Sequence, residues 1–450
     1  MSMNPLPILA AHAASWRDRP WPRGLEHHAR RALLDWFAAM LPGTRCAPAT
    51  LLAAALAEER GGGGAVCYVD GQRGGARHAA LLNGVASHVV EFDDIHRDSG
   101  MHPGGPTIAA ALAIAQAGGH DMDALLRAVT AGYEVGCRIA LAVQPSHYRM
   151  WHVTGTAGTM GAAAAAALLL GCDAARIGHA VALAATMAGG LQQAFRGEGM
   201  SKPMHPGHAA EAGVLAARAA AAGVTGAPDV LHGPAGFAAA TSESTGSWDR
   251  ALEGLDARFV IGSMTFKNHG CCGHIFPALD GVLALRMRAP FGPADVARIH
   301  VAGYRATAEI CDRPVVTTEQ EARFSVQYCI AVLLHGGAVR LDAFAPERLA
   351  DPALHDFMAK VSVGLSPDLA DAYPRKRAAR IRIELTDGRV LEHEQPFRKG
   401  DPEDPLTDAE LDSKFRELAT PVIGPREAEA LLRAIRHGAD LPGEVSRPEG

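Results

Sequence analysis

Long stretches of alanine, glycine and leucine constrain this chain more than any other feature of its sequence. Small apolar side chains favour closely packed helices, whereas a strand-rich core would be enriched in valine, isoleucine and aromatic residues. Hydrophobic residues make up 48% of the 450 residues, but aromatic residues only 5%. Because this length is too great for one ordinary core, the sequence predicts two domains of unequal size, the larger of them helical.

Helical periodicity dominates the chain from about residue 25 to residue 260. The expected helices cover residues 28–41, 122–143, 156–170 and 174–187. Pro42-Gly43 is expected to end the first of them, and Asp121 is the expected N-cap of the second. The last two are apolar on nearly all sides, which predicts buried helices. Helices joined by short turns are typical of an all-α domain.

The pattern changes near residue 265. Alternating apolar residues predict strands at 296–301, 379–385 and 390–394, the last two joined by a hairpin turn at 386–389. Helices are expected between them at 324–335 and 346–361. A capping box at Thr407 to Glu410 then begins a helix that reaches about His437. The sequence thus predicts a mainly α fold, with an all-α domain over residues 1–265 and 405–450 and an inserted α+β domain over residues 266–404.

The net charge bears on the kind of partner, and the cysteine spacing bears on whether the thiols are free. A net charge of -6 and a pI near 6.4 argue against nucleic acid or an anionic membrane as the main partner. The longest run of small apolar residues, 161–171, is too short to span a bilayer, and the first residues do not resemble a secretory signal. The eight cysteines are scattered without a CxxC motif, so free thiols in the cytoplasm are expected.

Four irregular segments concentrate His, Asp, Lys and Gly between the apolar helices; they are residues 91–105, 147–155, 192–207 and 266–274. The first three are expected to lead into helices that begin near residues 108, 156 and 208. Helix N-termini present unpaired N–H groups and a partial positive charge, which suit carboxylate ligands. Asp and His side chains there can exchange protons, and Lys can stabilise a developing negative charge. The sequence therefore predicts a site for an anionic small molecule.

Lysine is rare in this chain, with six lysines against 37 arginines. A lysine that persists in such a chain is more often needed for its compact ammonium group. Lys202 and Lys267 stand in two of the four segments and are expected to hold substrate carboxylates in one cleft. Substitution of Lys360 or Lys414 is expected to have little effect.

Other interpretations of the same residues remain open. The alternative interpretation of Asp93, His96 and His152 is that each is a helix cap or a buried polar group without catalytic function. Metal ligands can be drawn from His205 with His208, and from the pair Cys271-Cys272 with its neighbouring histidines, but neither spacing suits a tetrahedral ion. A cysteine nucleophile is an equally generic possibility. The expectation is that the site holds no metal and no cofactor.

Three motifs together are more specific than any single residue. They are Phe92-Asp93-Asp94 followed by His102-Pro103-Gly104-Gly105, then Trp151-His152-Val153-Thr154-Gly155-Thr156, and Ser201-Lys202-Pro203-Met204-His205-Pro206-Gly207. Spaced as they are, they resemble the MmgE/PrpD family, which includes 2-methylcitrate dehydratase, cis-aconitate decarboxylase and iminodisuccinate epimerase. The resemblance implies a helical domain made from both chain ends, a smaller α+β lid and a homodimer.

The resemblance also implies roles for individual residues. The implied catalytic residues are Asp93, His102, Tyr148, His152, Lys202 and Lys267, and the implied substrate-binding residues are Asp94, His96, Arg196 and Cys272. His102 and His152 would be the base and the acid. Glu91 and Ile95 stand where the decarboxylase resemblance would want Asp and Thr, which argues against cis-aconitate itself as the substrate.

The function implied is that of a metal-independent, dehydratase-type lyase that removes a proton next to a carboxylate of a small polycarboxylate. The main alternative is an isomerase or epimerase of an imino- or hydroxy-dicarboxylate. A helical metal-dependent hydrolase and a non-catalytic binding protein are less favoured.

Overall fold

The computed structural model describes residues 3–195, 199–373 and 375–446. Its chain divides into two compact units, one formed by Met1–Thr265 with Thr407–Gly450 and the other by Phe266–Leu406. Most of the described chain is helical, and the one sheet of more than two strands lies in the second unit. The predicted fold class, mainly α with a smaller α+β part, is confirmed.

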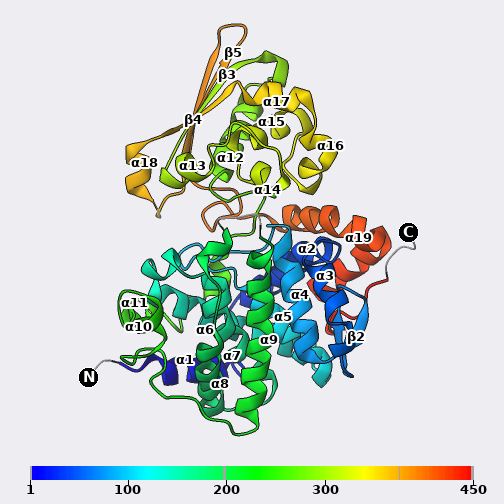
Figure 1. Cartoon of the computed structure of the whole chain (residues 1–450), viewed down its shortest axis with the longest axis vertical. Coiled ribbons are helices and arrows are strands. Elements are labelled where there is room, and N and C mark those ends of the chain that lie inside the picture. Colours follow the sequence, from blue (N-terminus) through cyan, green and yellow to red (C-terminus); the bar gives the residue numbers. More distant parts are fainter. Residues whose placement is uncertain (1–2, 196–198, 374, 447–450) are drawn as a thin grey trace. The chain divides into compact units, whose positions relative to one another are not determined.

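Helices build nearly all of the first unit (Figure 1). They are α1 (Pro5–Ser15), α2 (Leu25–Gly43), α3 (Ala49–Ala55), α4 (Ala76–Val89), α5 (Gly104–Gly118), α6 (Met122–Val143), α7 (Val153–Leu169), α8 (Ala174–Met187), α9 (Ser201–Ala221), α10 (Phe237–Thr241), α11 (Trp248–Leu252) and α19 (Asp408–His437), with short 3₁₀ turns η1 (Ala57–Glu59), η2 (Ser146–Arg149), η3 (Gln192–Phe195) and η4 (Val260–Ser263). Asp121 caps α6 by accepting a hydrogen bond from the Ala124 amide, which confirms the expected N-cap.

Helix α7 is the centre of this unit, and α5, α6, α8 and α9 pack around it (Figure 1). Every residue of α7 is buried. Its small side chains allow very close approach: a Cβ added at Gly161 would lie 2.7 Å from the carbonyl oxygen of Gly132 on α6. The alanine- and glycine-rich sequence is therefore the physical reason that one helix can be surrounded by four others.

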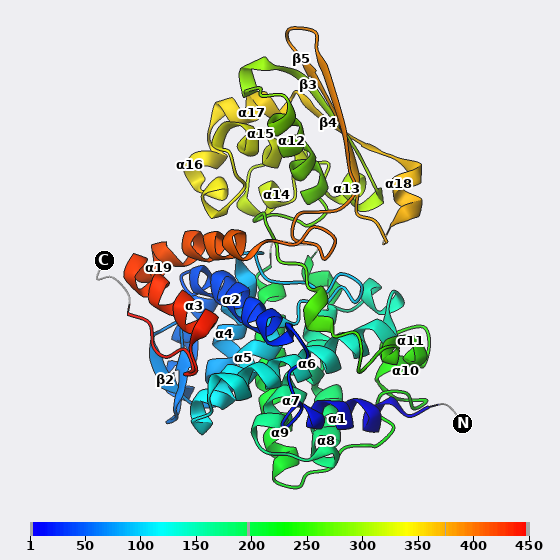
Figure 2. The same ribbon diagram turned by 180° about the vertical axis from the view of Figure 1, so that it is seen from behind.

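The C-terminal helix α19 packs along α2, from the N-terminal part of the chain, in the first unit (Figure 2). Thr407 and Glu410 form the predicted capping box at the start of α19. The Lys414 ammonium on α19 lies 2.6 Å from the Asp35 carboxylate on α2 and donates a hydrogen bond to the Phe92 carbonyl. Lys414 is buried and paired, so it is not a surface lysine, whereas the expectation that its substitution has little effect on kcat/KM stays a prediction. Gly424 interrupts α19 with a non-helical backbone.

A small hairpin, β1 (Ala65–Cys67) and β2 (Gln72–Gly74), precedes α4 in the unit that was expected to be all-α. The Asn83 side chain fixes it to α4, because its amide donates to the Val66 carbonyl and its oxygen accepts from the Tyr68 amide. Three-residue strands carry too little alternation to be found by periodicity.

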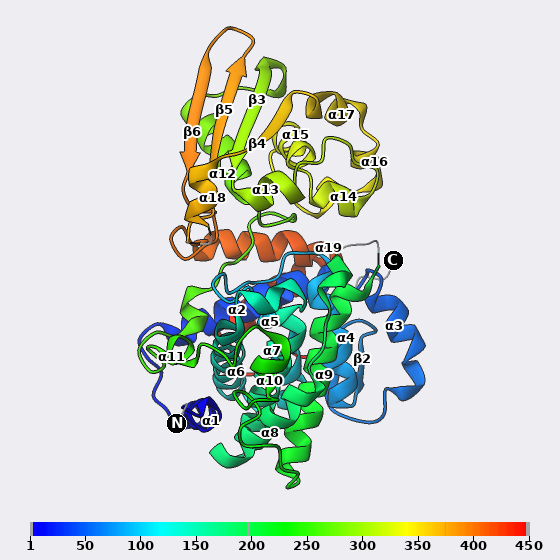
Figure 3. The same cartoon turned by 60° about the vertical axis from the view of Figure 1, so that its left-hand side comes forward.

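The second unit packs helices against a four-stranded sheet of order β4-β3-β5-β6, in which only the β3–β4 pair is parallel (Figure 3). Its strands are β3 (Val296–Gly303), β4 (Val361–Leu365), β5 (Ala379–Leu385) and β6 (Val390–Gln395). Its helices are α12 (Phe276–Arg288), α13 (Arg305–Ile310), α14 (Glu319–Arg323), α15 (Val326–Gly336), α16 (Pro346–Leu349), α17 (Pro352–Met358) and α18 (Pro367–Ala372), with 3₁₀ turns η5 (Pro293–Asp295) and η6 (Leu341–Phe344). The buried residues of β3 and β5 face α12 and α15 across one core.

Several expected boundaries are wrong. Helix α2 includes Pro42 and Gly43 in its last turn. The single helix expected at 346–361 is two short helices, and Val361 begins strand β4 instead. Helix α9 begins at Ser201 rather than near residue 208, because it continues through Pro206.

Within the described residues, no helix is long and apolar enough to cross a membrane. All eight cysteines are free.

Candidate functional site

The first irregular segment links the end of α4 to the start of α5. Glu91 turns the chain there, with a φ of 58° in the left-handed region that non-glycine residues seldom adopt. Ile95 then pairs with Thr265, and His96 pairs with Met101, so the segment folds back on itself. Helix α5 begins at Gly104, directly after His102 and Pro103. This loop brings the end of one helix and the beginning of the next to one place.

Asp93 lies between two histidines in this loop. Its Oδ2 accepts a hydrogen bond at 2.6 Å from Nδ1 of His88, on the last turn of α4. The same oxygen lies 3.0 Å from Nδ1 of His102. Asp93 and His88 are buried, and the His102 side chain is 13% exposed. Nε2 of His88 is buried without a hydrogen-bond partner among the described residues. One carboxylate thus orients His88 through a hydrogen bond and lies within ion-pair distance of His102, as in sites where histidine exchanges protons.

The neighbouring carboxylate, Asp94, has a different environment. Its two oxygens accept hydrogen bonds from the Gly104 amide and from the Tyr133 hydroxyl. Burial raises the pKa of Asp94 to about 8, with a further contribution from the negative charge of Asp35. Asp94 therefore fixes the start of α5 against α6.

The second segment supplies His152, the N-cap of α7. The two Nδ1 atoms of His152 and His205 lie 2.9 Å apart, so one ring must donate and the other accept. Burial lowers the pKa of His152 well below its usual value, and the pKa of His205 falls to about 4 for the same reason. The pair is neutral at pH 7. The His152 ring centroid lies 5.6 Å from that of His88, which joins the two segments in one cluster.

The third segment brings Lys202 to the same cluster. Lys202 stands in the first turn of α9 and forms an ion pair with Glu91. Its ammonium also lies 5.1 Å from the centre of the Phe195 ring, which packs edge-on against His152. The positive charge of Lys202 is one cause of the lowered pKa of His152. Both side chains of the ion pair are about 85% buried, so this cation stands in a partly desolvated site.

The remaining expected residues of the first unit are placed differently. His96 is buried beside the Ser99 hydroxyl at 2.9 Å, and burial lowers its pKa to about 4. Tyr148 lies in η2 and is 45% exposed. Arg196 lies outside the described residues. The structure thus brings Asp93, His102, His152 and Lys202 together.

In the second unit, Lys267 and Cys272 lie in the loop that precedes α12. Lys267 is buried and Cys272 is half-buried. The two histidines of this loop have separate partners within the unit: His269 lies 3.0 Å from Asp280, and His274 lies 2.7 Å from the Tyr304 hydroxyl. The printed partner of each histidine is thus a side chain other than a cysteine.

Sequence reasoning missed the part played by three residues in this cluster. His88 lies inside a regular helix, and only its five-residue spacing from Asp93 could have indicated the contact. His205 was considered with His208, yet His208 contacts Glu211 instead. Glu91 was treated as a substituted position, whereas it holds Lys202.

The cluster could be read as a metal centre, since ligand atoms of His88, Asp93 and His102 lie within 4.8 Å of one another. The contact of 2.6 Å between His88 and Asp93 favours a shared proton instead. Two ligand atoms on one tetrahedral zinc ion, bound at about 2.0–2.2 Å, stand roughly 3.3 Å apart. The arrangement is therefore best suited to proton transfer next to a bound anion.

Comparisons with known proteins identify relatives that cover most of the chain. The chain is 27% identical to human cis-aconitate decarboxylase over 382 residues, which cover 81% of this chain and 77% of the relative. It is 28% identical to the cis-aconitate decarboxylase-like protein oryM of Aspergillus oryzae, over 92% of this chain and 90% of the relative. It is 26% identical to cis-aconitate decarboxylase of Aspergillus terreus, over 82% and 81%.

Two family domains cover most of the sequence. Residues 8–247 match the MmgE/PrpD N-terminal domain, and residues 269–437 match the MmgE/PrpD C-terminal domain. The resemblance seen in the three motifs is confirmed by these matches. The chain belongs to the MmgE/PrpD family.

Proposed function

We propose that this chain is a metal-independent lyase that acts on a small tricarboxylate by transferring a proton at a carbon next to a carboxylate. The observation that carries the proposal is the shared carboxylate of Asp93, which orients His88 and His102 beside a neutral histidine pair and a partly buried lysine. Relatives named cis-aconitate decarboxylase support a tricarboxylate as the substrate class.

The proposed steps follow from the protonation states of these side chains. With Nδ1–H of His102 directed at Asp93, its Nε2 keeps a lone pair and can accept a proton from carbon. Asp93 then stabilises the imidazolium that forms. A substrate carboxylate takes the place of Glu91 on Lys202, which also stabilises the enolate-like charge. His152 stays neutral and hydrogen-bonds to that charge, because its depressed pKa excludes a second cation.

The bond that breaks decides the reaction. In a dehydration the enolate-like intermediate expels hydroxide from the neighbouring carbon. In a decarboxylation carbon dioxide leaves instead of a proton, and the electron pair left on carbon accepts a proton from an imidazolium. Loss of carbon dioxide is the first reaction to test because of the names of the relatives, and loss of water is the dehydratase reaction that the motifs suggested. Glu91 and Ile95 differ from the decarboxylase pattern, so we expect a tricarboxylate with a different substituent to react faster than cis-aconitate.

The test is incubation with cis-aconitate and a panel of hydroxytricarboxylates in D₂O, followed by mass spectrometry and NMR. A decarboxylase releases carbon dioxide and takes one deuteron from solvent onto the product carbon. A dehydratase releases water and exchanges deuterium into substrate that returns from the enolate-like state. The Asp93→Asn variant should do neither. Absence of both mass loss and deuterium exchange across the panel would overturn the proposal.

An epimerase is the second candidate. Two separate histidine groups, His102 with Asp93 and His152 with His205, offer one group to remove a proton and another to return it. An epimerase would incorporate deuterium without changing the carbon skeleton of the substrate. Imino- and hydroxy-dicarboxylates therefore belong in the same panel.

For the second unit, we propose that Lys267 contacts a substrate carboxylate and that Cys272 contributes to substrate binding. Lys267→Ala should lower kcat/KM by about 10²-fold, as loss of a carboxylate contact does. Its melting temperature should be measured in parallel, since Lys267 is buried.

We also propose a homodimer. Large apolar side chains are exposed on the second segment and directly before the third: Met150 at 68% and Leu191 at 55%. These residues lie side by side, because the Gln192 amide donates to the Met150 carbonyl. A second copy would cover them. Light scattering should give twice the mass of the chain, and Met150→Glu should shift it toward the monomer.

A further inference from the structure

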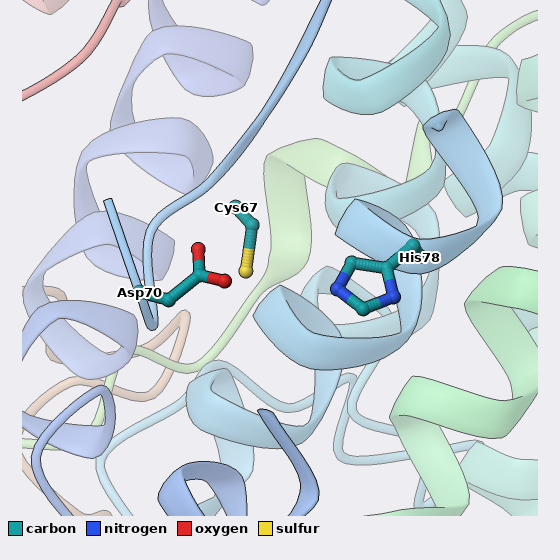
Figure 4. Close-up of side chains that lie close together, drawn as sticks. All are labelled: Cys67, Asp70 and His78. Carbon is teal, nitrogen blue, oxygen red and sulfur yellow. The ribbon is translucent and has the colours of Figure 1, made fainter. Parts of the chain in front are cut away.

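Three side chains with metal-ligand chemistry converge at the β1–β2 hairpin (Figure 4). Cys67 ends β1, Asp70 lies in the turn, and His78 stands in the first turn of α4. One ligand atom from each lies within 4.8 Å of the other two. A tetrahedral ion with bonds of about 2.0–2.3 Å needs ligand atoms roughly 3.3–3.8 Å apart, so a small contraction would place all three on one ion.

His78 points to a ligand that the protein itself does not supply. The residue is only 7% exposed, and its Nε2 is buried without a hydrogen-bond partner among the described residues. One ring nitrogen faces the sulfur of Cys67 (Figure 4). Buried polar atoms nearly always have a hydrogen-bond partner, so an unsatisfied buried nitrogen indicates that a ligand binds there. Burial lowers the pKa of His78, which keeps the ring in the neutral form that binds metals.

Cys67 and Asp70 complete the set. Cys67 is fully buried, and burial raises the pKa of its thiol to about 12, although the backbone amides of Val69 and Asp70 favour the thiolate. The Asp70 carboxylate is fixed by Arg60 at 2.8 Å and by the Gln72 amide at 3.0 Å. Such outer contacts orient a ligand without using all its lone pairs. The Asp70 side chain is 19% exposed, which leaves a path for an ion.

We propose that Cys67, Asp70 and His78 bind a zinc ion that fastens the β1–β2 hairpin to α4. One thiolate, one imidazole and one carboxylate suit a borderline-soft divalent ion, and water would take the fourth position. Binding replaces the Cys67 thiol proton by the metal and releases that proton to solvent. The site is separate from the cluster around Asp93, because His78 lies ten residues, or about 15 Å, along α4 from His88.

Cobalt is the probe that identifies the ligands, because a Co²⁺–thiolate bond gives a charge-transfer band in the near ultraviolet. The reduced full-length chain is stripped with chelator and titrated with Co²⁺, then with Zn²⁺. We expect one equivalent of Co²⁺ with this band, its loss on addition of Zn²⁺, and a higher melting temperature with either ion.

Variants separate this site from others. Cys67→Ser should abolish the band, and His78→Gln should raise the Kd for Co²⁺ at least tenfold. Cys172→Ser, a control at another buried cysteine, should bind as the wild type does. Cobalt held by His88, Asp93 and His102 would give no thiolate band. A band that survives in Cys67→Ser, binding without a band, or no binding by the folded wild-type chain would each overturn the proposal. If Cys67→Ser does not fold, Asp70→Asn and His78→Gln decide it.

Discussion

Asp93 is the residue on which the proposed chemistry depends most directly. In Asp93→Asn, the amide oxygen can still contact both histidines, but the negative charge that stabilises the His102 imidazolium is lost. We expect kcat to fall by about 10²- to 10⁴-fold, the usual range for loss of an acid–base group, while the melting temperature changes little. Steady-state kinetics on the substrate found in the panel measure this. Asp98→Asn is the matched control, because Asp98 lies in the same segment with a 61% exposed side chain and pairs with Arg97 at the surface. Equal losses in both variants would contradict the assignment.

Asp94, next to it, should control stability rather than catalysis. Its folded pKa of about 8 lies above the usual value of 3.8, so the folded state binds one more proton than the unfolded state between these pH values. Its contribution to stability is fully present below pH 4 and is lost as the pH rises toward 8. Asp94→Asn removes this dependence. We expect the melting temperature of the wild type, relative to that of the variant, to decrease steadily from pH 5 to pH 8. A constant difference over this range would mean that Asp94 is already ionised at pH 5.

At the scale of elements, the end of α4 and the start of α9 bring opposite charges together. Glu91 follows the end of α4 and has a left-handed backbone conformation, and Lys202 lies in the first turn of α9. Their ion pair therefore joins two helices through residues that are 111 positions apart in the sequence. The same arrangement makes Lys202 available to an anion that can displace Glu91.

Removal of Lys202 tests this arrangement. Lys202→Ala should lower kcat/KM by about 10²-fold or more, equivalent to roughly 2.7 kcal/mol of transition-state stabilisation. Lys202→Arg should restore only part of it, because a planar guanidinium does not replace a compact ammonium over the Phe195 ring. Lys360→Ala is the control, since Lys360 donates to the Val296 carbonyl in the other unit. Full activity in Lys202→Ala would remove this lysine from the site.

At the scale of the whole molecule, the C-terminal helix α19 supports the site from a distant part of the sequence. Lys414 pairs with Asp35 on α2 and holds the carbonyl of Phe92, the residue before Asp93. Lys414→Ala leaves a buried carboxylate without its cation. We expect a loss of about 3–5 kcal/mol in the free energy of unfolding, measured by urea denaturation. The double variant Asp35→Leu/Lys414→Met should recover much of the lost stability, because neither position then carries a buried charge without its partner. A small loss in Lys414→Ala would show that water reaches Asp35.

The sequence by itself determined the fold class and the four irregular segments. Helical periodicity and small side chains are local properties, and so are the N-cap at Asp121 and the capping box at Thr407, so these predictions were confirmed. The short strands β1, β2 and β4 were not predicted, because three to five residues carry little hydrophobic alternation.

Tertiary structure alone decided which residues of the segments meet. Local sequence does not tell that His88, inside a regular helix, faces Asp93, or that His205 turns to His152 rather than to His208. It also does not distinguish Lys414 from a surface lysine, since the partner of Lys414 is 379 residues away. The physical reason is the same in each case. Periodicity and capping depend on neighbours along one element, whereas burial, charge pairing and the pKa of Asp94 depend on what other elements bring to the same place.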